Sequence, residues 1–154
     1  MLDNMLNILC NMIKSEIFLT ILSGIIVFVL SQIIMEKVIK PRDRLKEEKG
    51  KIICCLTMYA NLIFNPYKIN SDNMVETDAY KNASSEIRKA ASEFAGLIES
   101  HSVICNRKKY SDVVSDLISL SNGLFQISTE FNTIEENRKC VNNIYKIFKI
   151  NKKF

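Results

Sequence analysis

Side chains capable of catalysis or metal binding are few in this 154-residue chain, and they do not group along the sequence. The single histidine, His101, has no second ligand three or four residues away, so the spacing of a helical zinc site is missing. Asp112 and Asp116 share one helical face, and we interpret them as solvated surface acids. Phosphate-binding loops, dinucleotide fingerprints and nucleophile elbows are also missing from the sequence. We therefore expect no cofactor, no bound metal and no enzymatic activity.

The cysteines form no CxxC pair, which makes a redox or zinc motif less plausible than ordinary packing. There are five: Cys10, Cys54, Cys55, Cys105 and Cys140. The adjacent Cys54 and Cys55 lie near the apolar face of a predicted helix, where cysteine acts as a small hydrophobic residue. Palmitoylation of this pair is the alternative, although the pair lies some distance from the predicted membrane segment.

One long apolar run dominates the N-terminal part of the chain. Residues 17–35 contain no charged side chain, and as a helix they would span about 28 Å, close to the hydrocarbon thickness of a bilayer. A buried helix of a soluble core rarely runs this far without a charge. A cleavable signal peptide would have a basic start and a small-x-small cleavage site, which are missing here. The sequence predicts a retained transmembrane helix over residues 15–38.

Basic residues near this segment are distributed unevenly, which predicts its orientation. Residues 36–51 contain seven Lys or Arg side chains, whereas the N-terminal side has only Lys14. By the positive-inside rule, the N-terminus lies outside and the C-terminus in the cytoplasm, with the protein in the inner (cytoplasmic) membrane. The basic residues nearest the apolar run are expected to contact the membrane surface; they are Lys37, Lys40, Arg42 and Arg44.

Two faces near the N-terminus could make further contacts. Residues 1–14 have apolar side chains at helical spacing, which predicts a short amphipathic segment in the interface or packed on a partner. Within the membrane segment, Thr20, Gly24 and Ser31 share one face. Small residues allow helices to approach closely in lipid, so this face is a candidate for self-association.

Residues 39–154 are expected to form a cytoplasmic helical domain. Pro41 is predicted to separate it from the anchor. Apolar stripes predict helices over about 42–64, 79–100, 111–127 and 132–148, with Ser111 as the N-cap of the third helix, which continues through Asn122-Gly123. The stripe of the second helix contains small residues, which permit a neighbouring helix to come close. The stripe of the third helix is Val113, Leu117, Leu120, Leu124 and Ile127, and that of the fourth is Ile134, Val141, Ile144 or Tyr145, and Phe148. Polar connections over 65–78 and 101–110 allow the chain to fold back, which favours a small antiparallel four-helix bundle over a coiled-coil stalk. The predicted fold class is all-α, with an N-terminal transmembrane helix before the bundle.

Several short pieces between residues 41 and 128 resemble an uncharacterised family of small bacterial membrane proteins. The matching pieces are Pro41, Tyr59-Ala60-Asn61 with Asn65-Pro66, residues 83–91 (ASSEIRKAA) and residues 117–122 (LISLSN). The resemblance implies a single N-terminal anchor and a helical cytoplasmic domain. It implies no activity.

Charge separates along the chain. Residues 36–51 and 146–154 have net charges of +3 and +4, whereas residues 52–145 have −2, with Arg107-Lys108-Lys109 as a local basic cluster. Attraction to anionic lipid explains this pattern better than nucleic-acid binding, because the bulk of the domain is slightly acidic. We expect an interaction module that binds a protein partner or self-assembles at the membrane. The alternative is a membrane-acting effector or small toxin that oligomerises through its anchor.

Overall fold

The computed structural model describes residue 5 and residues 16–68, 74–101, 106–126 and 133–150. The chain divides into two compact units, Met1–Arg42 and Asp43–Phe154. The prediction of an all-α protein is confirmed, because nearly all described residues are helical. The strands β1 (Tyr67–Lys68) and β2 (Phe125–Gln126) are only two residues long each. The predicted amphipathic segment over residues 1–14 lies outside the described residues, apart from Met5.

The first unit is built around α2 (Glu16–Ile34), which is followed by a π-helical turn, η1 (Met35–Ile39). Among the described residues, one helical stretch is long and apolar enough to cross a membrane; it includes α2, and its apolar window is not buried. The hydroxyls of α2 bond to the helix's own carbonyls. Thr20 Oγ1 donates to the Glu16 carbonyl at 2.8 Å and Ser31 Oγ to that of Val27 at 2.7 Å. This pairing removes the cost of placing these hydroxyls in lipid.

Pro41 was predicted to separate the anchor from the domain that follows. The boundary between the two units falls one residue after it, although the helix itself continues through Pro41. Pro41 is the second residue of α3 (Lys40–Met58), and the backbone is helical from Glu16 to Met58. Proline has no N–H, and its ring collides with the carbonyl four residues earlier in a regular α-helix. The π-helical turn directly before Pro41 relieves this collision, because its wider pairing carries the Lys40 N–H to the Met35 carbonyl.

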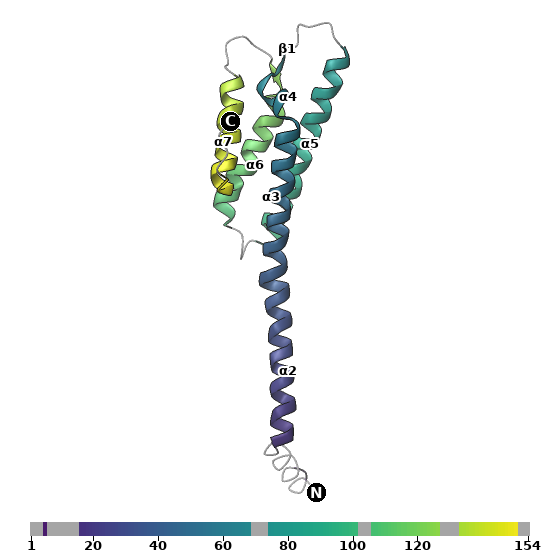
Figure 1. The fold of residues 1–154 in the computed structure, drawn as a ribbon, viewed down its shortest axis with the longest axis vertical. Coiled ribbons are helices and arrows are strands. Elements are labelled where there is room, and N and C mark those ends of the chain that lie inside the picture. The colour runs from purple at the N-terminus through teal and green to yellow at the C-terminus, as the bar shows by residue number, and fades with distance from the viewer. Residues whose placement is uncertain (1–4, 6–15, 69–73, 102–105, 127–132, 151–154) are drawn as a thin grey trace. The chain divides into compact units, whose positions relative to one another are not determined.

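The second unit is an antiparallel helical bundle in which the helix over residues 107–122 packs against those over residues 74–100 and 133–148 (Figure 1). After α3 come α4 (Ala60–Phe64), α5 (Met74–Ser100), α6 (Arg107–Asn122) and α7 (Thr133–Phe148). Apolar side chains from all of these helices form one core, including Ile52, Ile63, Ile87, Phe94, Leu117 and Ile144. The predicted stripes of the first three bundle helices thus supply most of the core.

The first predicted bundle helix, 42–64, is divided in two in the structure. Tyr59 leaves α-helical geometry with φ −98° and ψ 11°, and α4 continues from Ala60 to Phe64. The following Tyr67 donates its N–H to the Leu124 carbonyl at 2.8 Å, and β1 pairs with β2 in parallel. The predicted loop over 65–78 therefore contains a short strand, and α5 begins at Met74 rather than near residue 79.

Both predicted ends of the third bundle helix were wrong. The N-cap of α6 is Asn106, whose side chain accepts the Lys109 N–H at 3.1 Å, whereas Ser111 lies inside the helix and donates to the Lys108 carbonyl. The helix ends at Asn122, with Gly123 as its C-cap. Leu124 is nonetheless buried, because the turn at Gly123 directs it into the core. An apolar residue at helical spacing therefore misled the prediction.

The predicted stripe of α7 is buried except at its first residue. Ile134 was expected in the core but is 41% exposed, and the buried residue in the first turns is Asn137. Asn137 Nδ2 donates to the Ile63 carbonyl at 2.8 Å and to the Gly123 carbonyl at 3.0 Å. These bonds fasten the ends of α4 and α6 to α7. Ile144 and Tyr145, predicted as alternatives, are both buried.

Candidate functional site

A shallow groove lies between α5 and α6 on the second unit. It has a volume of about 350 Å³ and is lined by Arg88, Ala91, Ser92, Ala95, Val114, Ile118 and Asn122. The small side chains come from α5, and Val114 and Ile118 form the apolar side on α6. Ile118 is 43% exposed, which is high for a large apolar residue within such a bundle. The sequence showed the small residues of α5, but it did not show which helix stands beside them.

Arg88 sets the charge at one end of this groove. Its Nη2 donates to Asn122 Oδ1 at 2.7 Å, and both Nη2 and Nε contact Ser121 Oγ at 3.3 and 3.4 Å. These acceptors are neutral, and none of the ion pairs among the described residues includes Arg88. The guanidinium is therefore held in a fixed position and keeps its charge available for an acidic group.

The predicted membrane-surface residues belong to both units. Lys37, Lys40 and Arg42 belong to the first unit and are exposed, and Lys40 forms an ion pair with Glu36 at 3.9 Å. Arg44 belongs to the second unit, where it borders a charged depression with Glu47, Glu48, Lys51 and Glu93. Glu48 and Glu47 together raise the pKa of Lys51 by hydrogen bonding, so its charge is locally satisfied.

The candidate packing face of the anchor stays a prediction. Thr20, Gly24 and Ser31 all lie on α2, and a Cβ placed on Gly24 would have no neighbour within 4 Å. Since the hydroxyls of Thr20 and Ser31 are paired internally, this face presents small surfaces without unsatisfied polar groups. Such a surface suits close helix packing in lipid.

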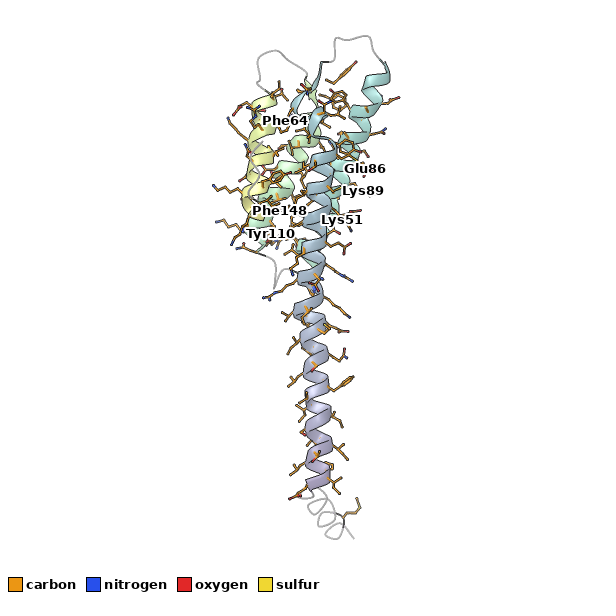
Figure 2. All side chains as sticks on the ribbon, in the orientation of Figure 1. Lys51, Phe64, Glu86, Lys89, Tyr110 and Phe148 are labelled. Carbon is orange, nitrogen blue, oxygen red and sulfur yellow. The ribbon has the colours of Figure 1, made fainter. Side chains whose placement is uncertain are left out.

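Lys49 lies at the end of the bundle where α3 enters it. Its Nζ donates to Tyr110 Oη at 2.8 Å and stands 5.4 Å from the centre of the Phe148 ring. Phe94 contacts both aromatic rings edge to face. These contacts bring the beginning of α6 and the end of α7 against the first part of α3, as Figure 2 shows through the positions of Tyr110 and Phe148.

Asp112 and Asp116 differ in their surroundings, which corrects the prediction that both are solvated acids. Asp112 is exposed, but Asp116 is partly buried and accepts a 2.7 Å hydrogen bond from Asn143 Nδ2. Burial raises the pKa of Asp116, although its bonds from Asn143 and Cys140 oppose this change. The sequence could not show this, because the covering residues come from α7.

The thiols of Cys55 and Cys140 are partly buried, which favours their protonated form. Burial raises the pKa of Cys55 to about 11 and that of Cys140 to about 11, the latter also because Asp116 lies beside it. Cys55 packs against the core whereas Cys54 is exposed, so the expected packing holds for one of the pair. His101 follows the end of α5, where its N–H bonds to the Leu97 carbonyl, as expected for a helix-end residue. Cys10 and Cys105 lie outside the described residues.

Comparison of the chain with known protein families, curated proteins and solved structures finds no match. The resemblance to small bacterial membrane proteins stays a prediction. The features that bear on function are therefore those of the chain itself: the anchor, the bundle and the groove.

Proposed function

We propose that this protein is a membrane-anchored helical interaction module. In this proposal α2 crosses the cytoplasmic membrane once, the N-terminus lies outside, and the bundle binds a protein partner in the cytoplasm. The length and apolar character of α2 support the anchor, and the seven-to-one excess of basic residues on its C-terminal side supports the orientation. The observation that carries the binding role is the groove between α5 and α6, with Ile118 exposed on its side.

The chemistry of the groove favours an amphipathic helix as its occupant. Ala91, Ser92 and Ala95 are small enough for a helix backbone to come close, and Val114 and Ile118 offer apolar surface to its buried face. Arg88 stands at one end without a carboxylate partner among the described residues, so the occupant should carry Asp or Glu opposite it. The anchor confines the bundle to the membrane surface. The effective concentration of a partner at the same surface is therefore raised, and even a weak contact can be occupied.

Site-specific photo-crosslinking in intact cells tests the binding role. A photoreactive side chain at Ile118 of the full-length protein should trap a discrete protein adduct, and the same group at the exposed Lys139 of α7 should not. Arg88→Glu should abolish the adduct, because it would oppose the acidic partner. If the trapped protein is a second copy of this chain, the groove serves self-assembly instead of the binding of another protein. A failure to crosslink at Ile118, or an adduct insensitive to Arg88→Glu, would reject this groove as the binding surface.

Reporter fusions test the orientation. A reporter that is active only outside the cytoplasm should be silent when fused after Phe154, and a cytoplasmic reporter at the same position should be active. The opposite pattern would refute the cytoplasmic location of the bundle.

A further inference from the structure

The end of the bundle where α3 enters gathers basic side chains from three separate segments. Lys49 connects α3 with the start of α6 and the end of α7 through its contacts with Tyr110 and Phe148. The same end therefore carries the first turn of α6 and the last residues of α7. We call this surface the basic end; its exposed or partly exposed cations are Lys108, Lys109, Lys146 and Lys149.

The charges of the basic end are not neutralised within the described part of the chain. Arg107, beside them, pairs with Glu99 at 2.7 Å, but no ion pair among the described residues includes any of the four lysines. Several other cations of the bundle are paired with acids, both at this end and away from it. Glu135 pairs with Arg138 in α7, and Asp78 pairs with Lys81 in α5. The four lysines of the basic end thus carry positive charge that no described carboxylate pairs with.

Three of these four lysines occupy places that are unfavourable for the fold. The first turn of α6 contains Arg107, Lys108 and Lys109 and no acid, although the positive end of a helix dipole favours acids. Lys149 has a φ of 60°, the left-handed conformation that glycine adopts most readily at a helix C-terminus. The adjacent Ile150 N–H bonds to the Tyr145 carbonyl at 2.9 Å and closes this cap. Cations at the start of α6 and at the end of α7, where stability favours other residues, indicate a role outside the fold.

We infer that the basic end docks on an anionic bilayer surface. This inference rests on the proposed anchor. Asp43, where the bundle begins, follows the last residue of the apolar run by only eight positions, a reach of at most about 28 Å even in an extended chain. Within the bundle, the first part of α3 is the segment nearest to the anchor along the chain, and Lys49 joins this segment to the start of α6. The charge of the basic end complements acidic lipid headgroups. The sequence shows basic residues at the start of α6 and at the end of α7, but only the fold places them at the same end of the bundle.

Lysine reactivity of the full-length protein in lipid nanodiscs tests the inference. One preparation contains only phosphatidylcholine, and the other contains 30 mol% phosphatidylglycerol. Acetylation of Lys108, Lys109, Lys146 and Lys149 should slow by about fivefold per site in the anionic discs, the ratio that corresponds to one basic residue at such a surface. Lys81 and Lys139 serve as internal controls and should react equally in both. High salt should remove the difference, since the attraction is screened.

Each outcome has a distinct meaning. Equal acetylation of the basic end in both discs, with the chain still embedded, would overturn the inference and leave the anchor intact. A chain that fails to enter either disc would refute the anchor itself, and the inference with it. A third measurement adds duplex DNA to the protein in the discs that contain only phosphatidylcholine. Protection of the basic end by DNA, without protection by anionic lipid, would overturn the inference in favour of nucleic-acid binding.

A pair of matched variants separates docking from general charge loss. The first replaces Lys108, Lys109, Lys146 and Lys149 with Gln, and the second replaces Lys81, Lys89, Arg138 and Lys139 with Gln. In anionic discs, amide hydrogen exchange in the first turn of α6 should be slowed for the parent protein and for the second variant only. Equal slowing in the first variant would contradict the inference. Equal helicity of the two variants by circular dichroism verifies that both are folded.

Discussion

Gly123 at the end of α6 provides the sharpest test of how the bundle is held together. Its φ of −71° and ψ of −1° suit any amino acid, so the backbone itself would accept alanine. The obstacle is packing, because a methyl group at this position would overlap Asn137 Oδ1 and approach the Ser119 carbonyl at 3.2 Å. We predict that Gly123→Ala displaces the Asn137 side chain and destabilises the bundle.

The expected magnitude follows from the bonds that Asn137 makes. Its Nδ2 donates to the carbonyls of Ile63 and Gly123, and the residue is only 3% exposed. Losing both bonds at a buried site costs about 1 to 2 kcal/mol each, so the free energy of unfolding should fall by about 2 to 4 kcal/mol. Gly96→Ala is the matched control. Gly96 lies inside α5 with no neighbour within 4 Å of an added Cβ, so this change should raise stability by about 1 kcal/mol.

Guanidinium unfolding of residues 43–154, followed by far-ultraviolet circular dichroism, measures both changes. A double variant tests whether the two residues act through one contact. Once Asn137→Ala has removed the amide, Gly123→Ala should lower the free energy of unfolding by almost nothing further. The reasoning would be refuted if Gly123→Ala stabilised the bundle as Gly96→Ala does. It would also be refuted if the effects at positions 123 and 137 simply added.

Three further predictions concern the two units and the end of α7. Residues 43–154 without the anchor should be predominantly helical and melt cooperatively, because their core is complete within that unit; a disordered spectrum would contradict this. Gly24→Ile should abolish a dimer band after crosslinking in membranes, since it adds a branched side chain to the small face of α2, and an unchanged band would assign any association elsewhere. Lys149→Gly should raise stability by about 1 kcal/mol by relieving the left-handed backbone, whereas Lys146→Gly within α7 should lower it by a similar amount. A loss of stability in Lys149→Gly would show that its side chain, rather than its backbone, determines the cap.

The helical pattern of the chain could be predicted because burial repeats at helical spacing. Val113, Leu117 and Leu120 were expected on one face of their helix, and all three are fully buried. The helix ends were harder to predict. Asn106 and Ser111 are both good cap residues, and the choice depends on the burial of Tyr110, which draws the helix start earlier. Likewise Leu124 has helical spacing, but it reaches the core from a turn.

The candidate groove and the environment of Asp116 depend on which helices become neighbours. Spacing along α5 indicates a line of small residues, yet Ile118 and Val114 face them only because α6 packs beside α5. Asn137 illustrates the same limit. A polar residue in an apolar stripe gives no indication of its partners, and its two acceptors come from segments distant in sequence. Contacts of this kind are set by the tertiary arrangement and not by local propensity.

The Asn137 bridge also has a consequence for how the protein is made. Its acceptor at Ile63 is synthesised 74 residues earlier, which corresponds to roughly 4 to 15 s at ordinary rates of translation. During that interval the end of α4 lacks the donor that will satisfy it, and the core side chains of the earlier helices lack the cover of α7. A ribosome that stalls before α7 would release a chain with its apolar interior exposed. Quality-control proteases should therefore recognise truncated products far more readily than the finished protein.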